Sequence, residues 1–455
     1  MALSEQRNQL DQEPRRFLRT TGSAAIPVQL IVLFFLLSIL FVFGTALPVR
    51  ADTRHDPEKL DTLVALAMEN NPEVKASAAR WQMITERARQ AGTLEDPMVM
   101  LRLQNAFISD PLNFNRDTAT AKVIGISQKL PFYGKRDLMR EEAGLEAEAE
   151  RWVVEERRIE LKRMVKEAWY QMYLVDRSLE TVAGNIRLMD DLIRLAESMY
   201  GVGKTGQQEI FQAQLERSKM EEMRIGLEQK RRSLAASLNT LAYRPVETVI
   251  PVIAKITLTP VALSATELER LALAHRPALK TLQAKIDKAG ASSRLAEKEL
   301  LPDVTVSLEY MQREPAMDTP GDDMYAAQLS FNLPIQHDRR RAKIAETQAE
   351  LRMATQELAV LRNKIQLGIS DGLAQLERSR KLTRLYDQGI LAQATSAVES
   401  GMAAYRTNKA KFTEVMASRI ALFNFEREYH GAVADHQMQL AVLEGVVGTP
   451  LPSRP

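Results

Sequence analysis

The sequence is built from two tandem repeats that share one offset of about 205 residues. Four pairs of residues keep this offset: Pro72 and Pro277, Pro97 and Pro302, Tyr200 and Tyr405, and Glu209 and Glu414. Pro131 and Pro334 are 203 residues apart, so the register slips by two within one segment and is recovered afterwards. Each repeat is therefore predicted to form the same series of elements: helix, strand, loop, strand, very long helix, turn and return helix.

The first 51 residues have the pattern of an export signal. Four arginines precede the uncharged run Thr20–Val49, and Val49-Arg50-Ala51 is a small-x-small pattern that suits cleavage before Asp52. A signal peptide over residues 1–51 is the preferred interpretation. A membrane anchor is the alternative, because the apolar run is long enough to span a bilayer.

The charge balance and the absence of cysteine exclude several functions. Residues 1–51 contain five of the 61 Lys and Arg residues and three of the 59 Asp and Glu residues, so the rest of the chain carries 56 of each. A chain without net charge lacks the basic excess of a nucleic-acid-binding protein. Without cysteine there are no disulfides, no cysteine-based zinc site, no thiol catalysis and no lipid on an N-terminal cysteine.

Neither metal nor nucleotide binding is predicted. The five histidines are scattered, and the closest pair, His430 and His436, is six residues apart, which places the two on different helix faces. Gly201-Val-Gly-Lys-Thr resembles the end of a phosphate-binding loop, but Ser198 stands where the upstream glycine would be. The sequence therefore indicates no enzyme, no cofactor and no metal site.

Each repeat contains two short segments in which apolar and polar residues alternate, as in a β-strand with unlike faces. They lie at about 99–107 and 118–130 in the first repeat and at 304–310 and 325–333 in the second. Each has about the ten residues that a tilted membrane-spanning strand requires.

Two proline-free segments, from about 134 to 200 and from about 337 to 405, are predicted to be helices of roughly 100 Å each. Large apolar residues recur every seven positions along both, as in a coiled-coil seam: Leu138, Leu145, Trp152 and Ile159 in one, Ile344, Leu351, Leu358 and Ile365 in the other. Four further helices have about half that length: 58–94, 207–243, 265–299 and 412–446. Two short helices stacked end to end would match one long helix.

Four strands cannot form a membrane protein alone, because an open sheet leaves unpaired backbone groups at its edges and the smallest membrane barrels have eight strands. The chain is therefore expected to assemble with copies of itself. An exported oligomer with a β-barrel at one end and long helices at the other is a tube. The polar segments between paired strands, 108–117 and 314–322, should then face the cell exterior.

The duplicated motifs occur in a fixed order: Asn-Asn-Pro72 and His-Arg-Pro277, the strands led by Pro97 and Pro302, the Leu-Pro exits at Pro131 and Pro334, and the turn segments that begin at Tyr200 and Tyr405. In this order and register, nearly all of residues 52–455 resembles the TolC family of outer-membrane efflux channels. The resemblance implies a mainly α protein with a membrane β-barrel. Three chains would give four strands each to a twelve-stranded barrel in the outer membrane of a Gram-negative bacterium, continued by a helical barrel in the periplasm.

The resemblance also implies a function and partners. A homotrimer of this family is a passive exit duct, embedded in outer-membrane lipid, for substrates delivered by a periplasmic adaptor (membrane fusion protein) and an inner-membrane pump of the resistance-nodulation-division type. The segment Gln128–Arg136 is most similar to the CzcC-like branch, which acts in heavy-metal resistance. Heavy-metal cations are therefore the favoured substrate, with drugs or other small molecules as the second class.

The turns 201–206 and 406–411 should form the closed periplasmic tip, as the resemblance implies. The expected constriction residues are Tyr200, Glu209, Tyr405 and Glu414, and the expected adaptor contacts are Gly201, Gly203, Lys204, Thr205, Arg406, Thr407, Asn408 and Lys409. In a three-fold assembly each carboxylate becomes a ring of three, which favours cations. The family's arginine five residues after the second tyrosine is Ala410 here. The alternative is that both glutamates are ordinary first-turn residues that the helix dipole favours.

The expected division of the chain follows from the repeats. The first repeat covers 52–245, an equatorial connector covers 246–263 and forms a belt midway along the helical barrel, the second repeat covers 264–448, and a tail covers 449–455. The alternative function is an exported coiled-coil adaptor or scaffold without a channel. An adaptor would need one helical hairpin and a separate β-rich half, whereas here both strands and helices are duplicated.

Overall fold

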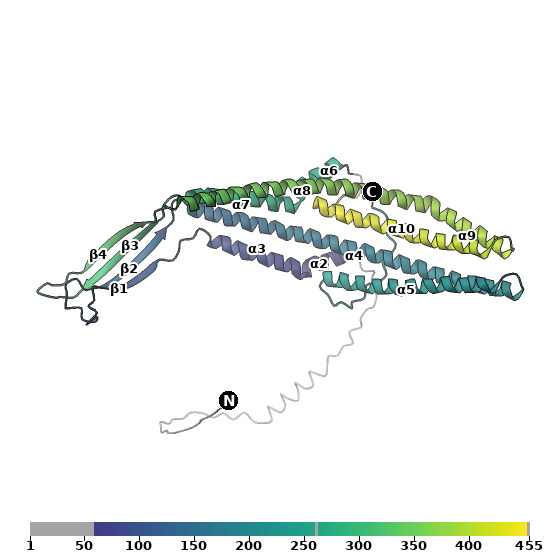
Figure 1. The fold of residues 1–455 in the computed structure, drawn as a ribbon, viewed down its shortest axis with the longest axis horizontal. Coiled ribbons are helices and arrows are strands. Elements are labelled where there is room, and N and C mark those ends of the chain that lie inside the picture. The colour runs from purple at the N-terminus through teal and green to yellow at the C-terminus, as the bar shows by residue number, and fades with distance from the viewer. Residues whose placement is uncertain (1–58, 260–262, 453–455) are drawn as a thin grey trace, which may run out of the picture. The chain divides into compact units, whose positions relative to one another are not determined.

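Strands from both repeats form one four-stranded antiparallel sheet in the order β1-β2-β3-β4 (Figure 1). The strands are β1 (Met98–Gln104), β2 (Ala121–Leu130), β3 (Val304–Arg313) and β4 (Met324–Phe331). The strands of the two repeats meet in the sheet where β2 pairs with β3. This pairing covers ten residues, from Ala121 opposite Arg313 to Leu130 opposite Val304. The computed structural model describes residues 59–259 and 263–452, so the predicted signal peptide lies outside the described residues.

The helices next to the sheet keep the order of the strands. Four helices border the strands: α3 (Pro72–Gln90), α4 (Lys135–Gly201), α7 (Pro277–Lys298) and α8 (His337–Leu385). Helix α4 packs against α3 and α7, and α7 packs against α8. The lateral order α3-α4-α7-α8 therefore repeats the order β1-β2-β3-β4, and each strand continues into its own helix.

Shorter helices pack end to end along the long helices, as predicted. The 67-residue α4 packs against α2 (Leu60–Asn70) and α3, and also against α5 (Gln207–Leu241). In the second repeat, α6 (Ala265–His275) and α7 pack on α8, while α10 (Phe412–Val447) packs on α8 and α9 (Leu391–Arg406). The Asn71 side chain accepts hydrogen bonds from the amides of Glu73 and Val74 and so caps α3, which starts at Pro72 directly after the break between α2 and α3.

One predicted helix is not a continuous α-helix. The segment expected from 337 to 405 contains a π-helical turn, Tyr386–Ile390, between α8 and α9. Gly389 in this turn has a low helix propensity. The Tyr386 hydroxyl donates a hydrogen bond of 2.6 Å to Glu428 on α10, which holds the widened turn against its neighbour.

The packing core includes part of the predicted seam. Leu358 and Ile365 of α8 are buried with Leu268 of α6 and Leu443 of α10. The predicted α4 residues Leu138, Leu145, Trp152 and Ile159 are half-buried, whereas Ala147, Ala149 and Val154 on the same stretch are buried. A buried stripe further along α4, which includes Leu161, Val165, Met172 and Tyr173, packs with Leu63 of α2.

The residues between the repeats, described from 246 to 259, cross α4, α5 and α10 without regular structure. The Asp176 carboxylate accepts hydrogen bonds from Arg231 at 2.6 Å and from the Ile253 amide at 2.9 Å. On the other repeat, Gln437 donates to the Thr257 carbonyl at 2.8 Å. This segment therefore fastens helices of both repeats to each other.

Within residues 59–259 and 263–452, none of the helices combines the length and apolar character needed to cross a membrane.

Candidate functional site

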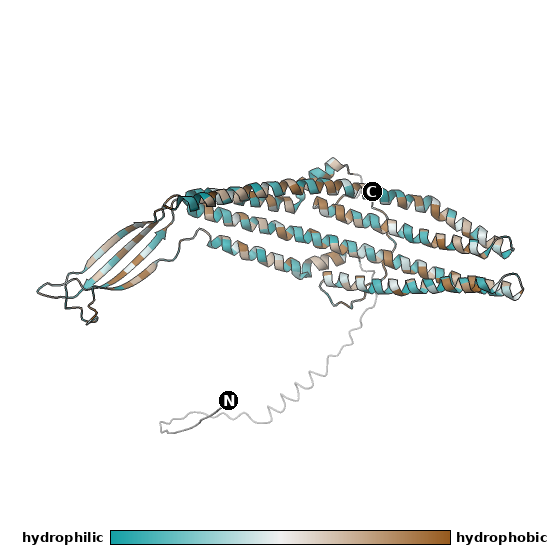
Figure 2. Cartoon of the chain, viewed as in Figure 1, coloured by the Kyte–Doolittle hydropathy of each residue, from teal (hydrophilic) through white to brown (hydrophobic). Residues whose placement is uncertain are grey.

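The sheet has one apolar face, on which large side chains are exposed. The alternation is visible along the strands (Figure 2). Because paired residues share a face, the register places Leu101, Ile124, Tyr310 and Tyr325 side by side. The apolar face comprises Val99, Leu101, Leu103, Ile124, Ile126, Val306, Leu308, Tyr310, Tyr325, Leu329 and Phe331, all exposed, with Leu101 at 78%. An exposed apolar surface of this extent requires a lipid or protein partner.

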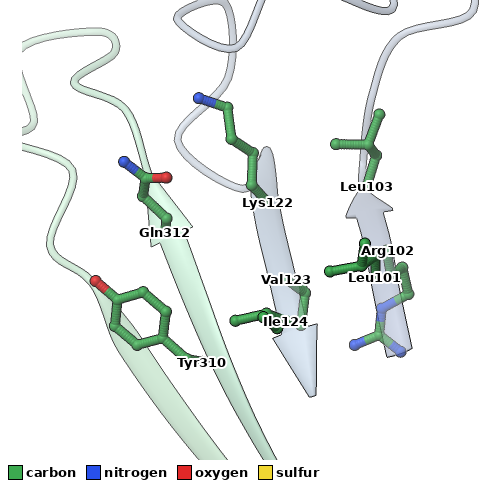
Figure 3. A pocket seen from close by; sticks show the side chains of 8 residues that line it. All are labelled: Leu101, Arg102, Leu103, Lys122, Val123, Ile124, Tyr310 and Gln312. Carbon is green, nitrogen blue, oxygen red and sulfur yellow. The ribbon is translucent and has the colours of Figure 1, made fainter. Parts of the chain in front are cut away.

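A hollow of about 390 Å³ lies on this face. Leu101, Ile124 and Tyr310 line its apolar part, and Lys122 and Gln312 line the part nearest the loops (Figure 3). The Lys122 ammonium lies 2.9 Å from Glu314 and over the Phe114 ring. The apolar face therefore ends in a polar rim at the loops.

The opposite face of the sheet is polar and carries Ser127, Ser307, Gln328 and Ser330 together with the charged residues Arg102, Lys129, Glu309 and Arg313. The three exposed large apolar residues here are methionines, Met98, Met100 and Met324. A sheet with one apolar and one polar face has the character of a barrel wall between lipid and water. The predicted alternation of the strands is confirmed.

The turn between α4 and α5 and the turn between α9 and α10 have the same backbone geometry. In the first, the amides of Gly203 and Lys204 donate to the carbonyls of Tyr200 and Met199, both at 2.9 Å. In the second, the amides of Asn408 and Lys409 donate to Tyr405 and Ala404 at 2.9 and 2.8 Å. Gly203 and Asn408 adopt positive φ angles of 72° and 58°, which glycine and asparagine tolerate best. The sequence offset of the repeats is therefore preserved in the backbone.

The two turns lie at the same end of the helices, where side chains of both repeats meet (Figure 1). The Tyr405 hydroxyl donates a hydrogen bond of 2.7 Å to the Glu209 carboxylate. Tyr405 is 3% exposed. Burial and the bond to Glu209 raise the pKa of Tyr405, so it stays protonated and remains the donor.

The other two predicted constriction residues are not brought into this contact. Tyr200 is 49% exposed, and its hydroxyl bonds to none of the described residues. Glu414 is exposed on the first turn of α10, and its carboxylate likewise has no bonding partner within the described chain. Tyr405 and Tyr200 therefore differ in structure although they are equivalent in the repeats. Tyr405 is buried and hydrogen-bonded to Glu209, whereas Tyr200 is exposed and its hydroxyl has no partner among the described residues.

The predicted adaptor-contact residues lie on the turns. Thr205 is half-buried, and the others are exposed: Gly201, Gly203, Lys204, Arg406, Thr407, Asn408 and Lys409. Lys204, Arg406 and Lys409 give the exposed surface of both turns a positive charge. Ala410 is half-buried, and Lys409 and Lys411 on either side of it are exposed.

Phe412 supports the Tyr405 contact and was not predicted from the sequence. Its ring lies 5.7 Å from the Tyr405 ring in an edge-on arrangement, and its side chain is 1% exposed. Phe412 packs with Met189 and Leu192 of α4, so it joins the two helical hairpins, α4–α5 of the first repeat and α9–α10 of the second. A signal was present in the sequence, because the equivalent residue of the first repeat is Gln207, and a change from polar to aromatic between repeats indicates an asymmetric role.

Helix α8 carries a second stripe that has no cover within the described chain. Met353, Val360 and Leu367 recur every seven residues, and all three are exposed. They lie two residues beyond Leu351, Leu358 and Ile365, and the last two of these are buried against the protomer's own helices. The outer edges of β1 and β4 also have no strand beside them in the described sheet. Both features mark surfaces that another chain would cover.

One known protein family matches both repeats. The sequence profile of the family described as "Outer membrane efflux protein" matches residues 63–242 and 268–449. A sequence relative is "Pyoverdine export outer membrane protein OpmQ" from Pseudomonas putida. It is 22% identical over an alignment of 408 positions that covers 86% of this chain and 84% of the relative.

Solved structures share the fold. The outer membrane protein VceC from Vibrio cholerae superposes with a TM-score of 0.72 at 16% identity, over 86% of this chain and 96% of that one. The CusC structure, described in terms of folding and transmembrane channel formation, gives a TM-score of 0.72 at 14% identity, over 87% and 93% of the two chains. At this level of identity the likeness concerns the fold alone.

Proposed function

Because the chain belongs to the outer membrane efflux protein family, we propose that three copies assemble into one duct that spans the outer membrane and continues into the periplasm. The chain functions in efflux at the outer membrane. The proposal rests on the sheet, which has an exposed apolar face and a polar face. The outer edges of β1 and β4 have no strand beside them in the described sheet. In hydrocarbon these edges must pair.

Pairing β4 of one copy with β1 of the next would satisfy both edges. Three copies with four strands each would close a twelve-stranded barrel. The helices follow the order of the strands, so the same rotation would close a helical barrel below it. The exposed stripe Met353, Val360 and Leu367 would then pack against the neighbouring copy.

We propose that the helical turns form the closed end of the duct and that the Tyr405–Glu209 bond holds it closed. The bond connects α9 of the second repeat to α5 of the first. Opening the tip requires the two hairpins to separate, and this bond would break as they do. Glu209 and Glu414 would supply rings of carboxylates at this end, which favour the passage of cations.

The proposed partners are a periplasmic adaptor and an inner-membrane pump of the resistance-nodulation-division type. Exposed Lys204, Arg406 and Lys409 would provide the adaptor with a basic contact surface. The duct itself would be passive, because energy would come from the pump.

Heavy-metal cations are the proposed substrate, on the basis of the CzcC-like segment Gln128–Arg136. Export of small organic molecules is the second candidate, and the relative named as a pyoverdine export protein favours it. Deleting the gene separates the two: loss of divalent-metal tolerance supports the first, whereas sensitivity to dyes or antibiotics with normal metal tolerance supports the second.

A coiled-coil adaptor or scaffold, the alternative from the sequence, lacks this support. Both the strands and the long helices are duplicated, and the family profile matches both repeats. Purified outer membranes should contain heat-modifiable trimers of the chain. Epitopes inserted at 108–117 or 314–322 should be accessible on intact cells. A monomer in the soluble periplasmic fraction would contradict the proposed duct.

A further inference from the structure

An ion pair on the polar face of the sheet connects two strands that are not neighbours. The Arg102 guanidinium on β1 lies 2.6 Å from the Glu309 carboxylate on β3, with β2 between them. The register places Arg102 opposite Val123 and Glu309 opposite Gly125. The two side chains therefore meet across the middle of the polar face, over the backbone of β2.

Gly125 makes this contact possible. A Cβ atom at this position would lie 3.1 Å from Cγ of Glu309 and 3.4 Å from Cε of Met100. A larger side chain would occupy the path between Arg102 and Glu309. Glycine is unfavourable within a strand, so its presence at the centre of β2 indicates a close approach of other groups.

Arg102 and Glu309 bring a positive and a negative charge together on the polar face of the sheet. The charged polar-face residues of the four described strands are Arg102, Lys129, Glu309 and Arg313. Lys129 lies at the helix end of the sheet, 3.4 Å from Glu95, and Arg313 at the loop end. Glu309 is thus the one carboxylate on the polar face of these strands, and its side chain is 12% exposed while that of Arg102 is 43% exposed.

We propose that Arg102 and Glu309 form a charge-compensated ring that sets the ion selectivity of the barrel section. The inference rests on the proposed trimeric duct, in which the polar face lines the lumen and each pair occurs three times. With the pairs intact, opposite charges cancel at this level and the section passes both signs of ion. Without Glu309, three arginines remain and attract anions; without Arg102, three carboxylates remain and attract cations.

The test is the reversal potential of single channels in planar bilayers under a KCl gradient. Glu309→Gln should lower the ratio of K⁺ to Cl⁻ permeability and Arg102→Gln should raise it, each by about threefold, the effect of a few screened unit charges in a water-filled lumen. The double variant Arg102→Glu, Glu309→Arg should return the ratio toward that of the wild type. Each variant is also made with Tyr405→Phe, because a closed tip in series would mask a change in the barrel.

Lys122→Gln is the matched control. It removes one positive charge, as Arg102→Gln does, from the neighbouring strand but on the apolar face. It should leave the permeability ratio unchanged. Heat-modifiable trimers of every variant establish that the barrel has assembled.

The possible results separate the inference from the proposed function. Opposite shifts for Arg102→Gln and Glu309→Gln support the ring. Assembled, conducting variants with an unchanged ratio, or with shifts of the same sign, would overturn it and leave the pair as a brace between strands. Absence of conductance from the wild-type trimer would instead contradict the duct.

Discussion

The Tyr405 hydroxyl and the Glu209 carboxylate, 196 residues apart in the sequence, form a hydrogen bond of 2.7 Å between the two repeats. It connects two helical turns between which apolar side chains also pack. Because the acceptor is a carboxylate, such a bond contributes more than one between neutral groups, about 1.5–3 kcal/mol.

Tyr405→Phe should loosen the tip without disturbing its core. The substitution removes the hydroxyl and keeps the ring against Phe412, so the protomer should fold and the trimer should assemble. We expect higher single-channel conductance and faster amide exchange in residues 199–209. Tyr200→Phe is the control, since the Tyr200 hydroxyl bonds to none of the described residues. Equal effects from both variants would show that the bond does not hold the tip closed.

Phe412→Ala should destabilise the tip more strongly than Tyr405→Phe. Removing a buried phenylalanine side chain costs about 3–5 kcal/mol, and Phe412 packs between both hairpins. Protease cleavage within the turns 201–206 and 406–411 should become faster. Phe211→Ala is matched in chemistry but removes an exposed ring on α5. If the two alanine variants are cleaved at the same rate, Phe412 does not join the hairpins.

The stability of the helical region should fall on mild acidification because of His430. Burial, together with Arg177 and Lys255, lowers the pKa of His430 to about 4, while Glu180 opposes this shift. Between the unfolded value of about 6.5 and 4, the unfolded chain binds a proton that the folded chain does not. Stability is therefore lost as the pH falls through this window, by about 2 kcal/mol after allowance for partial solvent screening.

His430→Phe should remove this part of the pH dependence. The measurement is the thermal unfolding midpoint of the detergent-solubilised trimer from pH 7 to pH 4. Tyr429→Phe keeps the imidazole and serves as the control. A His430→Phe protein whose midpoint falls with pH as steeply as that of the wild type would assign the acid sensitivity to other groups.

The exposed stripe of α8 should be required for assembly but not for folding of the protomer. Leu367→Glu places a charge where the proposed trimer buries an apolar side chain, so heat-modifiable trimers should be lost while the helical content stays unchanged. Arg362→Glu changes an exposed residue on the same helix, about 140° around the helix axis from Leu367, and should leave the trimers intact. Trimers of normal stability in the Leu367→Glu protein would mean that the stripe faces something else.

Most of the fold could be predicted because the strand pattern and the helix pattern each occur twice in the sequence. Alternation gave the strands and their unlike faces, and the absence of proline gave the long helices. The π-helical turn at Tyr386–Ile390 was not predicted, since no proline marks it and Gly389 alone is a weak signal.

The site was harder to predict because it depends on differences between the repeats. Tyr200 and Tyr405 occupy equivalent positions, and the tertiary packing around them, which includes Phe412, decides which of them is buried. The Arg102–Glu309 pair requires the register of β1 on β2 and of β2 on β3. Sequence alternation places both residues on the polar face, but it does not say which residues lie opposite each other.

Ion conduction by the assembled trimer decides whether three copies of this chain form a continuous water-filled duct. The most direct measurement is reconstitution of the purified trimer into a planar bilayer. We expect discrete conductance steps that are small in the wild type and larger in the Tyr405→Phe variant. Assembled trimers of both proteins that insert into the bilayer and yet conduct no ions would show that no such duct forms.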